Sequence, residues 1–132
     1  AELRKVHQFV TFCGITPLQW ALADYMTAHP EHVDEPRAFY QAKRDLFRDL
    51  LQGSRFTFKR TPGTYFQLAR YDRVSDLPDR AFAEWLTREV GVAVIPVSAF
   101  YADGRDDKVV RFCFAKRDDT LEAAAERLCK AL

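Results

Sequence analysis

The sequence lacks the short motifs on which several large classes of enzyme depend. Its 132 residues contain no G-x-x-x-x-G-K-[ST] phosphate loop, no G-x-G-x-x-G dinucleotide fingerprint and no G-x-S-x-G nucleophile elbow. Two pairs of adjacent aspartates occur, Asp106-Asp107 in a predicted turn and Asp118-Asp119 at a predicted helix start, where acidic groups interact favourably with the helix dipole. We therefore expect no complete catalytic centre within this chain.

Cysteine and histidine are scarce, with three of each. Cys13, Cys113 and Cys129 are odd in number and far apart, and no C-x-x-C occurs. This usage favours free, buried thiols in a reducing compartment, so we expect a cytoplasmic protein. The histidines form no H-x-x-x-H pattern, and His29 and His32 flank a proline in a polar stretch that resembles a surface loop. The sequence therefore predicts no metal site.

An excess of charge of one sign is also absent. Twenty basic residues face 19 acidic ones, which gives a net charge of +1. Nothing in this balance favours nucleic acid or an anionic membrane as a partner. The apolar runs are too short to span a membrane, and no apolar stretch follows a basic start, so we expect no transmembrane helix and no signal peptide.

What is present suffices for a folded core, because 48% of the residues are hydrophobic and 14% are aromatic. The patterning predicts helices over 16–29, 35–53, 76–90 and 119–132. Extended segments are predicted over 6–12, 56–59, 65–69, 92–95 and 109–116. Strands and helices do not alternate regularly in this order. We therefore predict an α+β fold with a small mixed or antiparallel sheet of about three to four strands, covered by helices on one side.

Local signals refine these predictions. Thr16, followed by Pro17 and Gln19, is typical of a capping box at the start of a helix. That helix is apolar over most of its circumference, which predicts that it is buried between other elements. Pro62-Gly63 favours a type II turn between two strands of a hairpin. The charged residues of the second helix are predicted to form its solvated face: Arg37, Arg44, Asp45, Arg48 and Asp49.

Arg111 is the best candidate functional residue, because it lies within an apolar strand (109–116). Alternation places it on one face with Val109 and Cys113, and places Val110 and Phe112 on the other. A guanidinium keeps its proton and is rarely buried without an anionic partner. A planar fork on a rigid strand suits a carboxylate, which it can bind through two parallel hydrogen bonds. The alternative is an arginine whose head reaches solvent or pairs with an internal carboxylate.

Three segments in a fixed order carry a family resemblance: VAVIPVSAF at 92–100, VRFCFAK at 110–116 and TLEAA at 120–124. GTYF at 63–66, VHQ at 6–8 and TPLQ at 16–19 fit the same pattern. Together they resemble the C-terminal part of a pyridoxal-phosphate-dependent aminotransferase of fold type I, class I/II, in its methionine and kynurenine aminotransferase-like branch. The resemblance covers nearly the whole chain.

The resemblance implies roles for particular residues. Residues 1–30 would be a connecting segment and helix from the large domain, and residues 31–132 would be the C-terminal small domain. Arg111 would bind the α-carboxylate of the substrate, and Tyr65 would be an aromatic residue near the substrate pocket. Phe12 and Cys13 fall in a segment that approaches the neighbouring subunit's site in the dimers of this family.

The implied activity is transfer of an amino group between an amino acid and a 2-oxo acid, with pyridoxal 5'-phosphate as cofactor and a homodimer as the assembly. The family's cofactor-binding lysine lies in a Ser-x-x-Lys type of motif, and none of the lysines present has that context. The resemblance therefore implies a piece of a longer enzyme that is inactive and binds no cofactor by itself. The alternative is a stand-alone, non-catalytic domain that binds carboxylates or another protein.

Overall fold

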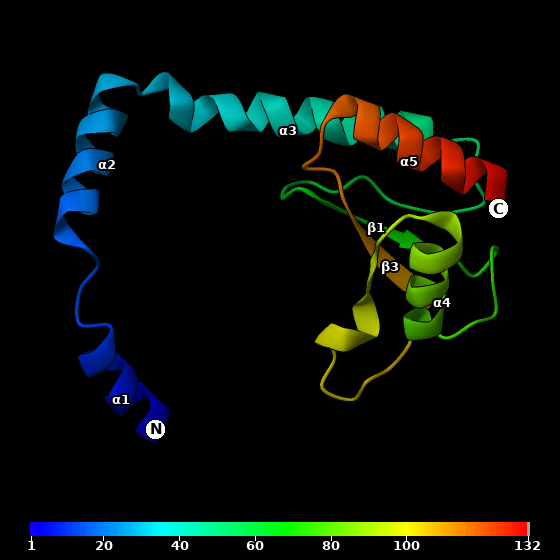
Figure 1. Cartoon of the computed structure of the whole chain (residues 1–132), viewed down its shortest axis with the longest axis horizontal. Coiled ribbons are helices and arrows are strands. Elements are labelled where there is room, and N and C mark those ends of the chain that lie inside the picture. The colour runs from blue at the N-terminus through cyan, green and yellow to red at the C-terminus, as the bar shows by residue number, and fades with distance from the viewer. Residues whose placement is uncertain (132) are drawn as a thin grey trace. The chain divides into compact units, whose positions relative to one another are not determined.

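The structure is a computed structural model that describes residues 1–131. The chain divides into two compact units, an N-terminal unit (Ala1–Arg37) and a C-terminal unit (Ala38–Leu132). The element order is α1, α2, α3, β1, α4, η1, β2, η2, β3, α5, which is coloured along the chain in Figure 1. Among the described residues, every helix is too short or too polar to cross a bilayer.

In the N-terminal unit, the predicted extended segment at 6–12 is wrong. Residues Glu2–Val10 form helix α1, in which Glu2 lies in the first turn and pairs with Lys5 at 3.1 Å. The β-branched and aromatic residues of this segment favour a strand by only a fraction of a kcal/mol each. A helix satisfies its backbone groups locally, without the partner strand that this unit does not supply.

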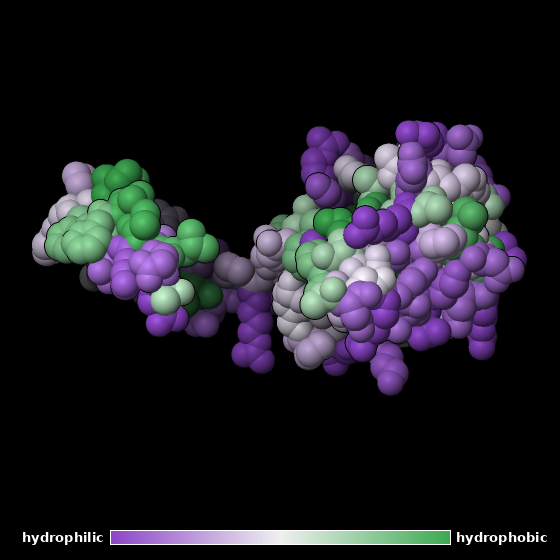
Figure 2. Space-filling view, turned by 90° about the horizontal axis from the view of Figure 1, so that it is seen from below, coloured by the Kyte–Doolittle hydropathy of each residue, from purple (hydrophilic) through white to green (hydrophobic). Residues whose placement is uncertain are grey.

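Helix α2 (Thr16–Ala28) confirms the position of the predicted helix but not its cap. Ile15 is the N-cap residue, Thr16 is already helical, and no side chain caps the helix. The helix contains no buried residue in this chain, and Trp20 is 67% exposed. Figure 2 shows the apolar side chains of the N-terminal unit at its surface. The prediction of a buried helix therefore fails within this chain.

Helix α3 (Glu31–Leu50) begins earlier than predicted and includes Pro36. A proline in a helix removes one backbone hydrogen bond and crowds the carbonyl four residues earlier. Pro36 is the sixth residue of α3, so only one bond is lost, close to the first four N–H groups, which lack helical partners in any case. The helix therefore continues through Pro36 and carries the chain from the N-terminal unit into the C-terminal unit.

The C-terminal unit contains a three-stranded antiparallel sheet of β1 (Phe66–Arg70), β2 (Ile95–Pro96) and β3 (Val109–Cys113), in the order β1-β3-β2. The predicted α+β class is confirmed. Three predicted strands are shorter than expected. Thr57 forms only an isolated bridge with Arg70, the 92–95 segment contributes one residue to β2, and the 109–116 segment is a strand only as far as Cys113. The positive φ of the turn before β1 falls on Thr64 (φ 61°), not on Gly63, so the predicted type II turn is also wrong.

Helices cover one face of this sheet. Val110 and Phe112 of β3 and Ala69 of β1 are buried there. Helix α5 (Asp118–Ala131) runs beside the C-terminal half of α3 (Figure 1), where Lys43 Nζ lies 2.7 Å from Asp118 Oδ1. The core side chains from helices and adjoining segments are Phe47, Leu51, Phe56, Tyr71, Phe82, Leu86, Val90, Val92, Phe114, Leu121, Ala125 and Leu128.

Helix α4 (Asp79–Trp85) continues into a wider turn, η1 (Leu86–Val90), and ends at Gly91. Gly91 adopts φ +73°, the left-handed conformation that glycine takes without strain. The predicted helix stop is therefore confirmed. Phe82 stacks on Tyr71 with ring centroids 4.0 Å apart, and this contact anchors α4 to the core.

Candidate functional site

Arg111 lies in the central strand, on the sheet face that the helices leave open. The strand register pairs it with Leu68 of β1 and with Ile95 of β2. Its neighbours Val110 and Phe112 point into the core. Because successive side chains alternate across a strand, the burial of these two neighbours fixes Arg111 on the open face.

Two aromatic rings contact the Arg111 guanidinium. Its Cζ atom lies 4.0 Å from the ring centroid of Phe66 on β1 and 4.8 Å from that of Phe100. Phe100 ends the short helix η2 (Val97–Phe100). Each such cation–π contact contributes about 0.5–1 kcal/mol, and more away from water. A guanidinium held over a ring keeps its N–H groups, which lie in its own plane, available to an acceptor.

The hydrogen-bonding groups of Arg111 are not satisfied within residues 1–131. Its Nε is buried without a hydrogen-bond partner, and no carboxylate among the described residues pairs with its guanidinium. A buried donor without a partner costs about 1–3 kcal/mol. An anionic group supplied from outside would recover that cost. The sequence left open that Arg111 pairs with an internal carboxylate. That pairing is excluded for the described part of the chain.

A groove of about 700 Å³ lies beside Arg111 on the open face of the sheet. Four of its lining residues are basic and none is acidic, although Arg70 pairs with Asp72 at 3.3 Å outside the groove. An apolar lining under a positive rim favours a ligand that combines an apolar body with an acidic group. The lining residues are Thr57, Phe58, Lys59, Arg60, Thr61, Pro62, Thr64, Phe66, Leu68, Arg70, Val109 and Arg111.

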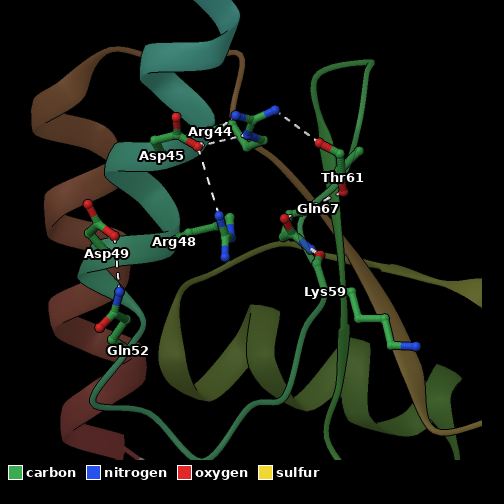
Figure 3. A network of polar contacts seen from close by, with 8 residues as sticks. All are labelled: Arg44, Asp45, Arg48, Asp49, Gln52, Lys59, Thr61 and Gln67. Carbon is green, nitrogen blue, oxygen red and sulfur yellow. Dashed lines mark hydrogen bonds and ion pairs between the residues drawn. The ribbon is translucent and has the colours of Figure 1, made fainter.

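One wall of the groove, segment 57–64, is held by buried polar side chains (Figure 3). Gln67 points into the protein, where its Nε2 donates to the Lys59 carbonyl at 2.8 Å. Arg44 Nη1 donates to the Thr61 carbonyl at 3.1 Å, and Arg44 Nε donates to Asp45 Oδ1 at 2.8 Å. The bonds to the Lys59 and Thr61 carbonyls tie the irregular segment to β1 and α3, and Asp45 holds the Arg44 guanidinium in place.

Arg44 corrects the predicted solvated face of the second helix. Arg44 is only 5% exposed, whereas Asp45 and Asp49 on the same helix are more exposed. The segment 57–64 folds over α3 and covers Arg44, because its carbonyl at Thr61 accepts the guanidinium. Helical periodicity alone places Arg44 on the solvated face and contains no information about this covering loop.

A second buried group fixes the segment that presents Phe100. The Asp79 carboxylate is 2% exposed. Its Oδ2 accepts the Ser98 N–H at 2.8 Å, and its Oδ1 accepts the Ser98 hydroxyl at 2.8 Å. Both bonds attach η2 to the start of α4, so Asp79 and Ser98 set the position of Phe100 against Arg111. Sequence patterning did not single out these residues, although Ser98 and Phe100 lie in the 92–100 motif.

Tyr65 immediately precedes β1, and its side chain is partly exposed. Its ring centroid is 4.3 Å from that of Phe66 and 5.9 Å from that of Tyr40. Tyr65 does not line the groove itself. Phe66 therefore lies between the two residues singled out from the sequence, since it contacts both Tyr65 and Arg111.

Phe12 and Cys13 belong to the N-terminal unit and follow α1, where both side chains are exposed. All three cysteines are free, as expected from their spacing. The expectation that they are buried is wrong, because Cys13 and Cys129 are exposed and Cys113 is only partly covered. Cys113 shares the open face of β3 with Arg111, which explains its partial exposure.

Comparison with known proteins identifies the family. The family model for aminotransferase class I and II matches residues 1–128. Methionine aminotransferase of Escherichia coli (strain K12) is 52% identical over 128 residues, which cover 97% of this chain and 33% of that protein. Kynurenine–oxoglutarate transaminase 3 of Rattus norvegicus is 35% identical over 145 residues, covering 95% of this chain and 32% of that protein.

Solved structures of aminotransferases are also similar to this chain. A structure from E. coli, described as having a methionine aminotransferase function, has a TM-score of 0.88 at 50% identity and covers 98% of this chain and 34% of its own. The N-succinyldiaminopimelate aminotransferase of Mycobacterium tuberculosis has a TM-score of 0.83 at 35% identity, with 95% of this chain and 33% of its own covered. The chain thus spans about a third of the length of the relatives that it matches. It belongs to the class I and II aminotransferase family.

Proposed function

We propose that this chain forms part of a pyridoxal-phosphate-dependent aminotransferase in which Arg111 binds the α-carboxylate of the amino-acid substrate and of the 2-oxo-acid product. The observation that carries the proposal is the Arg111 guanidinium, which two aromatic rings position and which no described side chain neutralises. Membership of the aminotransferase family supports this assignment, because the substrates of such enzymes carry a carboxylate.

The domain assignment belongs to the same proposal. Residues 1–30 would be the connecting segment and helix from the large domain, and residues 31–132 would be the small domain. The exposed apolar side chains of α2, including Leu18, Trp20 and Leu22, support a partner surface outside this chain. Phe12 and Cys13 would approach the site of a neighbouring subunit in a homodimer. The free thiols support a cytoplasmic enzyme.

The lysines of this chain do not suit attachment of the cofactor. Each lysine is exposed or only partly covered, and four of the six make bonds that hold them elsewhere. Lys43, for example, pairs with Asp118, and Lys108 donates to the carbonyls of Asp76 and Leu77. We propose that the remaining part of the full-length protein supplies the lysine and the cofactor site, and that this chain alone binds no cofactor and is inactive.

Pyridoxal phosphate, when bound, supplies the electron sink for bond cleavage at the substrate α-carbon. Arg111 contributes orientation: two parallel hydrogen bonds to the carboxylate fix the direction of the α-carbon. Holding a reacting carbon in place can supply several kcal/mol of the barrier reduction. Arg111 itself moves no proton, because a guanidinium remains charged.

The substrate side chain is proposed to be apolar or aromatic. The groove beside Arg111 is lined by apolar groups such as Phe66 and Leu68 and contains no carboxylate. Such a lining gives a basic substrate side chain no acidic partner. The relatives named for methionine and kynurenine agree with this class. Tyr65 is proposed to contact the substrate from the Phe66 side of the site.

The test is Arg111→Ala in the full-length protein, assayed with methionine and an aromatic amino acid. We expect kcat/KM to fall at least about 100-fold, or about 2.7 kcal/mol, because binding and orientation are lost together. Arg73→Ala is the matched control, since Arg73 is an exposed arginine that does not line the groove. A near-normal kcat/KM for Arg111→Ala, or an equal loss in the control, would contradict the assignment.

A further inference from the structure

Two histidines and two glutamates converge where α2 meets α3 in the N-terminal unit. His29 is the C-cap residue of α2, and Glu31, His32 and Glu35 lie in the first turns of α3. His29, Glu31 and His32 each offer one ligand atom, and these three atoms lie within 4.8 Å of one another. The sequence predicted no metal site, because it contains no H-x-x-x-H pattern and no Cys/His cluster, and because His29 and His32 flank a proline. The bend between the helices brings them together.

The distances suit a small divalent cation. Glu31 Oε1 lies 3.3 Å from His29 Nδ1 and 4.0 Å from His32 Nε2. Glu35 Oε2 lies 3.6 Å from His32 Nε2. Ligands around a tetrahedral zinc ion, with bonds of about 2.0–2.1 Å, are separated by about 3.3 Å. Small rotamer adjustments of these accessible side chains would therefore bring the donors into a single coordination sphere.

Tyr25 orients one of the histidines. Its hydroxyl lies 2.5 Å from His32 Nδ1, which leaves Nε2 directed toward the carboxylates of Glu31 and Glu35. A metal-binding histidine usually has its second ring nitrogen held by an outer polar group in this manner. The rings of His29 and His32 also stack, with centroids 5.3 Å apart. Ion pairing alone does not require this orientation.

We propose that His29, Glu31 and His32 form a binding site for a divalent transition-metal ion such as Zn²⁺, with Glu35 as an additional nearby carboxylate. Two imidazoles and a carboxylate are a donor set that favours zinc and similar ions over calcium or magnesium. The ion joins the C-terminal end of α2 to the first turn of α3 and stiffens this junction. The site is independent of the amino-group chemistry proposed above.

The test is calorimetric titration of ZnCl₂ into the full-length protein after treatment with a chelator. We expect a site that is lost, or weakened at least tenfold, in the double variant His29→Ala/His32→Ala. Tyr25→Phe should weaken binding by a smaller factor, because it removes only the orienting hydroxyl. His7→Ala is the matched control, since His7 is exposed and lies outside the cluster.

Exposed thiols are the main competing ligands for zinc. The variant Cys13→Ser/Cys129→Ser removes both exposed cysteines and should keep the site. Circular dichroism of each variant checks that it remains folded. The proposal is overturned if the unaltered protein binds no zinc. It is also overturned if zinc affinity is unchanged in His29→Ala/His32→Ala, or if it disappears in Cys13→Ser/Cys129→Ser.

Discussion

Ser98→Ala tests the buried bond that positions Phe100 beside Arg111. The Ser98 hydroxyl donates to Asp79 Oδ1 at 2.8 Å, and the Asp79 residue is 2% exposed. A hydrogen bond to a charged group contributes about 1.5–3 kcal/mol. Asp79 and Ser98 are both buried, so the lost donor has no described side-chain replacement, although the Ser98 N–H still donates to Oδ2. We therefore expect the free energy of unfolding to fall by about 1.5–3 kcal/mol.

The assay is urea unfolding of the chain in a Trp20→Phe background. The sequence has two tryptophans, so this change leaves Trp85, which packs against the core beside Phe82, as the fluorescent reporter. Ser54→Ala is the matched control, because the Ser54 hydroxyl donates to the neutral carbonyl of Leu51 at 2.6 Å. A neutral bond contributes about 0.5–1.5 kcal/mol. Equal losses in the two variants, or a loss below about 0.5 kcal/mol in Ser98→Ala, would refute the reasoning.

Ser98→Ala should also affect the site in the full-length protein. Loss of the hydroxyl loosens η2, and Phe100 at its end then holds the Arg111 guanidinium less firmly. We expect a fall in kcat/KM that is clearly smaller than that of Arg111→Ala, because the guanidinium itself remains. An effect on stability with no change in kcat/KM would show that the Asp79–Ser98 pair is structural only.

Further predictions concern the backbone and the charged surface. Thr64→Gly should raise the free energy of unfolding by about 0.5–1 kcal/mol, because Thr64 has φ 61° and glycine adopts this conformation without strain. Lys108 also has a positive φ, of 56°. Lys108→Gly should nevertheless show no such gain in the same urea assay, because it removes the bonds from Lys108 to the Asp76 and Leu77 carbonyls. Stabilisation by both substitutions would contradict this explanation. The hydrogen bond from Arg117 holds the pKa of Asp119 below its usual range. Because the folded-state pKa of Asp119 is lowered, its ionised carboxylate stabilises the folded state at pH values above its unfolded-state pKa. We therefore expect Asp119→Asn to be less stable than the unaltered chain at neutral pH. That difference should disappear as the pH falls through the folded-state pKa of Asp119, as unfolding curves at several pH values would show; a difference that persists in acid would exclude this origin.

The sequence predicted the fold class because the elements of the C-terminal unit have clear local signals. Alternation around Arg111 identified strand β3 and both of its faces, and Gly91 marked the end of a helical segment. Residues 6–12 were assigned wrongly because β propensity is weak when no partner strand is available. The capping prediction failed by one residue, since Ile15 occupies the N-cap position.

Part of the candidate site depends on contacts that sequence periodicity does not contain. The charge pattern of α3 predicts that Arg44 belongs to a solvated face, but a loop 17 residues away covers it through the Thr61 carbonyl. Asp79 and Ser98 are 19 residues apart and meet only because α4 and η2 pack together. The histidines and glutamates at the end of α2 likewise converge through a bend between two helices. The first two pairings join segments that are distant in the sequence, and helical or strand periodicity does not encode any of the three.

The most direct test of the central claim pairs removal of the guanidinium with removal of its proposed partner. The full-length protein and its Arg111→Ala variant are each assayed with an amino-acid substrate and with the matching amine, which lacks the α-carboxylate. If Arg111 binds that carboxylate, the substitution lowers kcat/KM at least about 100-fold for the amino acid and only a few-fold for the amine. An equal loss for both substrates would contradict the account, because Arg111 would then act on something other than the carboxylate.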